Sequence, residues 1–174
     1  MHPDISRVLL DQAALEIRIK EVGAQISRDY AGRSLLLVGI LRGSVVFLGE
    51  LMRSISTDCA VDFMCLSSYA GSGSTGNVRV LLDLRENCEG KDLLIVEDVI
   101  DTGLTLKHLL DILRTRNPRS LEVCTLLDKS TCRKVPAKAK YVGFEIPNEF
   151  VVGFGLDFNE KYRNLPYVGV LKSS

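Results

Sequence analysis

Two short, uninterrupted apolar runs limit the possible folds of this chain most strongly. Residues 35–41 (LLLVGIL) and 93–96 (LLIV) carry no polar side chain, so they lack the alternation of a strand that has one face in water. Both are far shorter than the roughly 18 to 20 apolar residues that cross a bilayer. Each precedes a helical pattern, and strand, helix, strand in succession is typical of the βαβ unit. The sequence therefore predicts an α/β fold with a central, mainly parallel twisted sheet flanked by helices.

The other elements follow from apolar spacing and from breaker residues. Leu15, Ile19, Val22 and Ile26 recur at helical spacing, with Asp11 as a candidate N-cap. The expected helices cover residues 11–30, 45–56 and 102–116, and the expected strands cover 35–41, 60–67, 78–84, 92–98, 121–128 and short pieces near 140–145, 150–154 and 167–171. The two strands on either side of the Gly/Ser-rich loop 68–77 are expected to pair antiparallel. Since no repeat, low-complexity segment or linker occurs, we expect a single domain over residues 1–174.

Charge and cysteine usage narrow the function classes. Twenty-two basic and twenty-two acidic residues cancel, which argues against duplex nucleic acid as a partner because such binding neutralises many phosphates. The five cysteines contain no Cys-x-x-Cys pair and fall mostly in apolar segments, so we expect buried thiols. The N-terminus (MHPDISRVLL) lacks the basic start and long apolar centre of a signal peptide. We therefore expect a cytoplasmic protein that binds a small molecule, and neither nucleic acid nor a membrane.

The most informative stretch is LLIVEDVIDTGLTL, residues 93–106. A buried strand runs directly into Glu97 and Asp98, and a helix begins a few residues later. In an open parallel sheet, ligands bind beyond the carboxyl ends of the strands, where a helix start offers N–H groups to an anion. Residues 101–105 could therefore hold a phosphate, while the carboxylates suit sugar hydroxyls or magnesium. The simpler alternative is a strand that leaves the core, followed by an Asp101 that caps the helix.

The same residues resemble the 5-phosphoribosyl 1-diphosphate signature of the type I phosphoribosyltransferases. That signature consists here of Glu97, Asp98, Asp101, Thr102, Gly103 and Thr105, with Leu104 where family members often have a polar or basic residue. Further segments, in order GILRGSVVF, SSYAGSGSTGN, LLDKS and FEIPNEFVVGFGLDFNEKYRNLP, resemble the hypoxanthine-guanine phosphoribosyltransferase family. The resemblance extends from about residue 35 to residue 170. It implies that the terminal segments form a small hood and that residues 68–77 form a mobile antiparallel loop.

The resemblance implies roles for two loops. Leu41, Arg42 and Gly43 would hold diphosphate, and the Leu41–Arg42 peptide bond would be cis; a plain strand-to-helix turn is the alternative. Ser68 and Tyr69 would fold over the site, whereas an ordinary hairpin loop would have no such role. The loop contains a Gly-x-Gly-x-x-Gly match at 71–76, but a strand follows it where a dinucleotide site requires a helix, so nicotinamide or flavin binding is not expected.

The resemblance also assigns the purine and metal contacts. Lys129 would donate to the 6-oxo group, Phe150 would stack on the base, and the Val151 backbone would contact its Watson–Crick edge. Asp157 would reach magnesium through water, and Arg163 would bind diphosphate. Without the resemblance, the alternatives are simpler. Lys129 would be a solvated surface residue, and Phe150 and Val151 would be core residues. Asp157 and Arg163 would form a surface ion pair.

The implied activity is purine salvage. A 5-phosphoribosyl group would pass from 5-phosphoribosyl 1-diphosphate to N9 of hypoxanthine or guanine, giving IMP or GMP and diphosphate. Asp101 would accept the purine N7 proton, Glu97 and Asp98 would bind the ribose hydroxyls directly or around Mg²⁺, and Thr102 to Thr105 would bind the 5′-phosphate. The resemblance implies a homodimer or homotetramer, with its interface near residues 41–43.

Three alternatives stay open at this point. The chain could be a nucleic-acid-binding regulator on the same fold, although it is neutral and short. It could be a phosphoribosyltransferase for another base, such as adenine or orotate. It could also be a doubly wound sugar-phosphate binder, which would not explain the loop 68–77 or the segment 144–166. The sequence contains no Walker-type Gly-Lys-Ser/Thr, so it does not support nucleoside triphosphate hydrolysis.

Overall fold

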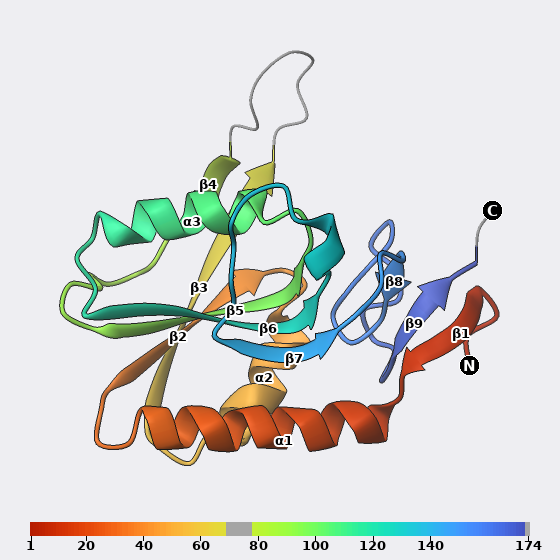
Figure 1. Cartoon of the computed structure of the whole chain (residues 1–174), viewed down its shortest axis with the longest axis horizontal. Helices are drawn as coiled ribbons and strands as arrows, with labels where there is room; N and C mark the ends of the chain where they lie inside the picture. The colour runs from red at the N-terminus through yellow and green to blue at the C-terminus, as the bar shows by residue number, and fades with distance from the viewer. Residues whose placement is uncertain (69–77, 173–174) are drawn as a thin grey trace.

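The computed structural model describes residues 1–68 and 78–172, and a six-stranded sheet forms its centre (Figure 1). The strand order is β4-β3-β2-β5-β6-β7; β4 is antiparallel to β3, and the other pairs are parallel. The α/β expectation and the antiparallel pair are confirmed. The strands of this sheet are β2 (Leu35–Leu41), β3 (Cys59–Ser68), β4 (Val78–Leu82), β5 (Asp92–Ile100), β6 (Ser120–Asp128) and β7 (Tyr141–Glu145).

Helices cover both faces of the sheet, which explains the two-sided apolar strands. Helices α1 (Gln12–Asp29) and α2 (Val45–Arg53) lie on one face and α3 (Leu104–Arg114) lies on the other (Figure 1). In β5, Leu94 and Val96 pack into the α1–α2 core, while Leu93 and Ile95 pack into the α3 core. A short 3₁₀ helix, η1 (Ser130–Cys132), follows β6. No helix in the described part of the chain is long and apolar enough to span a membrane.

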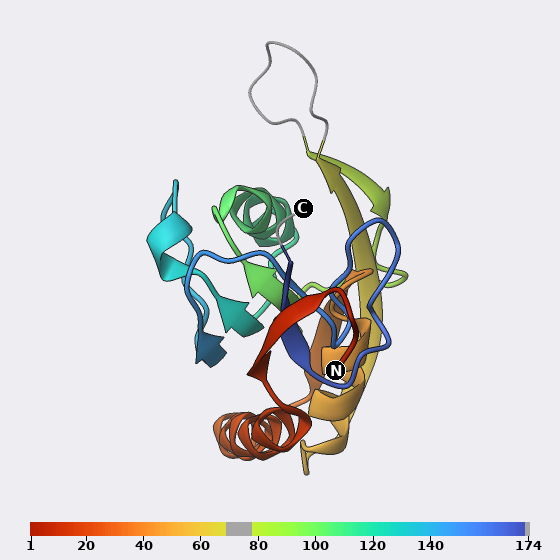
Figure 2. The ribbon, with the colours of Figure 1, turned by 90° about the vertical axis from the view of Figure 1, so that its right-hand side faces the viewer.

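The two ends of the chain form a second, smaller sheet, which we call the hood. Its antiparallel strands lie in the order β1 (Ile5–Leu10), β9 (Val168–Leu171) and β8 (Val151–Val152). Figure 2 looks onto the carboxyl ends of the main sheet and shows the hood in front of them. The expected hood of terminal segments is therefore present.

Several predicted boundaries differ from the structure. We assigned no element to residues 5–10, yet they form β1, because the short apolar stretch pairs with β9 at the far end of the sequence. The predicted strand 92–98 continues to Ile100, and the predicted helix 102–116 starts only at Leu104 because Gly103 has a left-handed φ of 81°. Most of the proposed mobile loop, including Tyr69, lies outside the described residues; Ser68 ends β3.

The strand order places a crevice between β2 and β5. From β2 the chain continues to β3 on one side, and it later returns to place β5 on the other side. Such a reversal leaves the carboxyl ends of the two central strands uncovered, and this is where ligands bind in open α/β sheets. Residues 41–43 lie at and just beyond the end of β2, and residues 97–101 lie at and just beyond the end of β5, so the two candidate loops meet there.

Candidate active site

The first wall of the crevice is the turn that joins β2 to α2. The peptide bond between Leu41 and Arg42 is cis, as the family resemblance implied. The Ser44 hydroxyl is fully buried and donates to the Ile40 carbonyl at 2.6 Å. This hydrogen bond fixes the turn from the end of the strand to the start of the helix. The Arg42 side chain lies in solvent at the rim.

Glycine at position 43 allows three segments to meet. A Cβ atom at Gly43 would overlap the Oδ2 atom of Asp98, so the acidic strand end packs directly on the glycine backbone. Gly155, at a left-handed φ of 100°, approaches the Gly43 carbonyl so closely that a Cβ there would also collide. The β2 turn, the end of β5 and the segment before Asp157 are therefore in direct contact.

At the end of β5, Glu97 is buried and Asp98 is partly buried. Glu97 is only 8% exposed, and burial raises its pKa well above the usual range, with the charge of Asp98 adding to the effect. Burial likewise raises the pKa of Asp98 to about 6, although the Val99 N–H at 2.8 Å and the charge of Arg163 oppose the rise. Two crowded carboxyl groups of this kind favour a ligand that brings hydroxyl donors, positive charge or a cation.

The turn after the acidic pair is shaped to accept an anion. Gly103 is the N-cap of α3 and provides no side chain to satisfy the first helical N–H groups. Gly103 leaves no room for a larger residue, since a Cβ atom there would lie 2.7 Å from the Cβ atom of Ala137. Thr102 Oγ1 accepts from the Leu104 N–H at 3.4 Å. A cavity of about 120 Å³ lies against this turn and is lined by Glu97, Asp101, Thr102, Gly103 and Thr105. Leu104 is half exposed beside it.

Lys129 is buried and lies beside Asp101. It follows β6 directly, and its backbone N–H donates to the Ile100 carbonyl at 3.0 Å. Its side chain is only 10% exposed, and its Nζ atom lies 3.9 Å from Oδ2 of Asp101, whose side chain is 52% exposed. The solvated alternative for Lys129 is therefore wrong. A buried ammonium next to a more open carboxylate forms a polar pair that can read a heterocycle.

Sequence reasoning missed Arg133, whose hydrogen bonds hold the backbone next to Lys129 and Asp101 in place. Its guanidinium donates to the carbonyls of Ile100, at 2.9 Å, and of Asp101, to the Asp128 carboxylate and to the Ala137 carbonyl, at 3.1 Å. One side chain thus joins the end of β5, the end of β6 and the segment after η1. No local pattern marks it, because two of its partners, the Ile100 and Asp101 carbonyls, lie more than 30 residues away in the sequence.

The second wall of the crevice carries a network of charged residues. Arg163 donates to the Gly155 carbonyl at 2.8 Å and pairs with Asp157 Oδ1 at 2.8 Å. Glu160 extends this network, since it lies 2.9 Å from Arg42 and 3.6 Å from Arg163. The Asp157–Arg163 ion pair, which was the alternative to the predicted metal and diphosphate roles, exists, and it faces the acidic strand end. A cavity of about 340 Å³ collects these groups and is lined by Arg42, Gly43, Glu97, Asp98, Asp157 and Arg163.

The two residues expected at the base differ in exposure. Phe150 is 55% exposed and packs edge-to-face against Phe158, with ring centroids 5.4 Å apart. Core packing is therefore not its role, and its ring is accessible to a planar ligand. Val151 is buried in β8, where it pairs with Val170. Neither residue lines the cavity between the β2 turn and Asp157.

The carboxylates suit a metal that brings other ligands with it. Among residues 1–68 and 78–172, no cluster of three or more His, Cys, Asp or Glu side chains could hold an ion by itself. Magnesium is bound in many phosphate sites by one or two carboxylates together with phosphate oxygens and water. Glu97, Asp98 and Asp157 fit that arrangement.

Comparison with known proteins gives one consistent family. Residues 7–159 match the model of the phosphoribosyl transferase domain. Hypoxanthine-guanine phosphoribosyltransferase from Staphylococcus aureus is 50% identical over 173 residues, which is 99% of this chain and 97% of the relative. A crystal structure of a hypoxanthine phosphoribosyltransferase from the same species has a TM-score of 0.95 and covers 99% of this chain and 94% of its own. A Bacillus anthracis hypoxanthine-guanine phosphoribosyltransferase structure has a TM-score of 0.91 at 43% identity and covers 97% and 98% of the two chains.

Proposed function

Since the chain belongs to the hypoxanthine-guanine phosphoribosyltransferase family, we propose that it is a purine salvage enzyme that carries out the family's transfer. The 5-phosphoribosyl group moves from 5-phosphoribosyl 1-diphosphate to N9 of hypoxanthine or guanine. The observation that carries the proposal is the acidic pair of a buried Glu97 and a partly buried Asp98, which lies between an anion-binding helix start and the turn at Gly43. A regulator that binds nucleic acid is not favoured, because the full-length relatives are named as enzymes.

The acidic pair binds the ribose in this proposal. Glu97 and Asp98 accept hydrogen bonds from the ribose hydroxyls. As the bond from C1′ to the diphosphate oxygen breaks, positive charge develops on the ribose ring. The same carboxylates stabilise that charge, and their low-dielectric surroundings strengthen the effect. Substrate binding also supplies the hydroxyl donors that this pair requires.

The two ends of the sugar phosphate meet different parts of the site. The backbone N–H groups and hydroxyls of residues 102–105 hold the 5′-phosphate at the start of α3. Leu104 contributes through its backbone in this arrangement, so its apolar side chain is tolerated. The diphosphate leaving group is bound by the turn Leu41-Arg42-Gly43 and by Arg163. These groups stabilise the negative charge that develops on the diphosphate as its bond to C1′ breaks.

The purine occupies the space next to Asp101. Its N9 forms the new bond to C1′, and Asp101 accepts the proton that leaves N7, so the purine ring of the nucleotide is neutral. Lys129 donates to the 6-oxo group, which selects against adenine because the 6-amino group is itself a donor. Phe150 stacks on the ring and the Val151 backbone contacts the Watson–Crick edge.

We propose Mg²⁺ as the cofactor. Asp157 would hold it through water, and Glu97 and Asp98 would hold it together with the ribose hydroxyls. When bound, the ion neutralises charge on the diphosphate and so makes it a better leaving group.

We propose a single domain over residues 1–174, a cytoplasmic location and a homodimer or homotetramer. The surface of helix α2, which follows the diphosphate turn, supports the proposed oligomer. Val45, Gly49 and Met52 form an apolar stripe on it; Val45 and Met52 are 46% and 39% exposed, and no described atom lies within 4 Å of a Cβ at Gly49.

An ultraviolet assay tests the activity. Purified protein is given 5-phosphoribosyl 1-diphosphate, Mg²⁺ and hypoxanthine, guanine, xanthine or adenine separately, with and without a chelator. We expect turnover of 6-oxopurines that the chelator stops. If no base reacts while 5-phosphoribosyl 1-diphosphate still binds, the enzymatic proposal is wrong and an electrophoretic shift assay with nucleic acid becomes the next experiment.

Two substitutions test the assignment of the base residues. Asp101→Asn keeps the shape of the side chain but cannot accept the N7 proton, so we expect kcat to fall by about 10²-fold or more with nucleotide binding retained. Lys129→Ala should raise KM for hypoxanthine more than KM for 5-phosphoribosyl 1-diphosphate. Full activity of the first variant, or an unchanged purine KM in the second, contradicts the respective role.

A further inference from the structure

Glu160 lies in a backbone segment whose conformation directs it back toward the crevice. Asn159, Glu160 and Tyr162 have φ values of 53°, 60° and 76°, which are left-handed and uncommon for residues other than glycine. The Glu160 N–H donates to Oδ2 of Asp157 at 2.9 Å, and Phe158 and Lys161 form an isolated β-bridge. The segment therefore forms a tight turn, and Glu160 lies at its tip.

The two oxygen atoms of Glu160 face two different arginines. Oε1 lies 2.9 Å from Nη1 of Arg42, and Oε2 lies 3.6 Å from Nη2 of Arg163. Both arginines line the 340 Å³ cavity, and Arg163 and the turn at Arg42 are the groups to which we assign diphosphate. The carboxylate of Glu160 thus offers the two guanidinium groups the same kind of acceptor oxygens that diphosphate would offer.

Arg163 does not depend on Glu160 for a partner. It already pairs with Asp157 at 2.8 Å and donates to the Gly155 carbonyl at 2.8 Å. The side chains of Glu160 and Arg42 are 66% and 67% exposed. Since exposed ion pairs are weak, a polyanion can displace the Glu160 carboxylate at little cost. The position of Glu160 therefore suits an exchangeable counter-ion better than a structural support.

We propose that Glu160 tunes diphosphate affinity by competing with diphosphate for Arg42 and Arg163. The inference rests on the proposed function, since it requires that the crevice binds diphosphate. In the empty site Glu160 and Asp157 together balance the charges of the two arginines. When diphosphate is present, the nearby carboxylate repels it and weakens its binding. The consequence is faster release of the leaving group after transfer.

Glu160→Gln tests the proposal by a gain of affinity, which damage to the fold would not produce. The measurement is calorimetric titration of wild type and variant with magnesium diphosphate. We expect the Kd to fall roughly two- to fivefold in Glu160→Gln, the range that an exposed ion pair supplies. The difference should shrink as ionic strength rises, because salt screens exposed charges.

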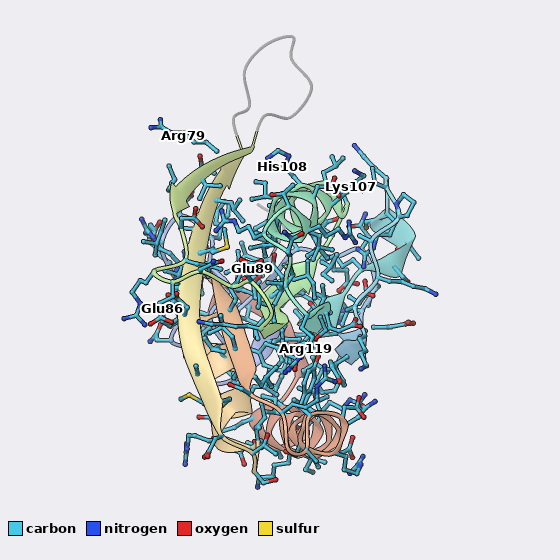
Figure 3. All side chains as sticks on the ribbon, turned by 90° about the vertical axis from the view of Figure 1, so that its left-hand side faces the viewer. Arg79, Glu86, Glu89, Lys107, His108 and Arg119 are labelled. Carbon is cyan, nitrogen blue, oxygen red and sulfur yellow. The ribbon has the colours of Figure 1, made fainter. Side chains whose placement is uncertain are left out.

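The matched control is Glu86→Gln, which changes the net charge equally. Glu86 pairs with Lys91 at 2.9 Å and lies near the amino ends of the parallel strands, which face the viewer in Figure 3. The Kd of the Glu86→Gln variant for diphosphate should equal that of wild type. In an Arg42→Ala background, the gain from Glu160→Gln should be smaller than in wild type, because one of the two contested partners is gone.

The possible results separate this inference from the proposed function. If wild type transfers the phosphoribosyl group and binds diphosphate, but Glu160→Gln binds it equally or more weakly, competition by Glu160 is refuted. An equal gain in Glu86→Gln also refutes it, since the effect would then reflect net charge alone. If wild type neither turns over nor binds diphosphate, the proposed function itself fails.

Discussion

The ionised side chain of Asp98, which the site requires, lowers the stability of the folded protein. Burial raises the pKa of this carboxyl group from 3.8 to about 6, despite the opposing Val99 N–H and the charge of Arg163. Between these two pH values the folded protein holds the proton more tightly than the unfolded chain does. Stability is therefore lost as pH rises from about 4 to about 6, and the loss persists at neutral pH. The functional ionised form is the form that destabilises the empty site.

Asp98→Asn should accordingly stabilise the ligand-free protein at about pH 8, by roughly 1–2 kcal/mol once solvent contact through the cavity is allowed for. Near pH 4 the gain should disappear, because the native carboxyl group is then protonated. Turnover should be largely lost at all pH values. Thermal melts at the two pH values, together with the ultraviolet assay, check these points. A lower melting temperature at both pH values contradicts this account.

Arg133 acts on the reaction only through other groups. Because its guanidinium holds the Ile100 and Asp101 carbonyls, we expect Arg133→Ala to misalign Asp101 and to lower kcat about tenfold or more. Added guanidinium ion should restore part of this kcat by occupying the vacated site, whereas it should not improve Arg114→Ala, a change at an exposed arginine of α3. A normally folded Arg133→Ala protein that guanidinium does not rescue would refute the positioning role.

At the scale of the elements, local signals explain what the sequence predicted well. β2 and β5 are apolar on both faces, and α1 has a periodic apolar face and an Asp11 N-cap that accepts from the Ala14 N–H at 2.8 Å. Each signal lies within one element. The acidic end of β5 could be predicted for the same reason, since the motif and the strand that carries it are contiguous.

Features that depend on long-range pairing were missed. The short apolar stretch of β1 becomes a strand only because Ile5 pairs with Leu171. Arg133 and Glu160 likewise acquire their importance from partners on other elements. The separate roles of Lys129 and Asp101 at the base followed from family resemblance, but their approach to 3.9 Å was not predicted, and no property of the LLDKS segment alone indicates that its lysine is buried. Local sequence therefore supplied the elements and the signature, whereas tertiary packing supplied the supporting residues.

Asp92 joins three elements at the end of the sheet opposite the site. Its carboxylate is fully buried and accepts from Arg33, from Arg119 and from the Ser120 hydroxyl at 2.6 Å. Arg119 lies among the amino ends of the strands in Figure 3. These bonds, led by that from Arg119, hold the pKa of Asp92 well below its usual range, although burial opposes them. The carboxylate thus connects the starts of β2, β5 and β6.

Asp92→Ala should lower the free energy of unfolding by about 3 kcal/mol at neutral pH, because it leaves two arginines without their buried partner. A depressed pKa contributes stability above the unfolded value and loses it as pH falls below about 4, so the gap to wild type should narrow in acid. Urea unfolding at both pH values checks this. Asp111→Ala, at an exposed carboxylate of α3, should change stability by less than about 1 kcal/mol. Equal losses in the two variants would contradict the role of Asp92.

At the scale of the molecule, the N-terminus supports the segment that carries the charged residues. The Tyr162 hydroxyl donates to Asp4 Oδ2 at 2.7 Å, and the His2 N–H donates to the Tyr167 hydroxyl at 2.8 Å. Residues next to β1 thus hold the turn that presents Glu160 and Arg163. The hood joins the two ends of the chain and supports one wall of the crevice (Figure 2).

The proposed oligomer can be tested on α2 without weakening the helix. No described atom lies within 4 Å of a Cβ at Gly49, so Gly49→Arg fits the isolated chain, and arginine is a better helix former than glycine by up to about 1 kcal/mol. A charged side chain between Val45 and Met52 should prevent a second copy from packing there. Sedimentation velocity should show a dimer or tetramer for wild type and a smaller species for Gly49→Arg. Thr115→Arg, just after α3 on the opposite face of the sheet, should keep the mass of wild type. If Gly49→Arg also keeps that mass, the stripe on α2 is not the interface.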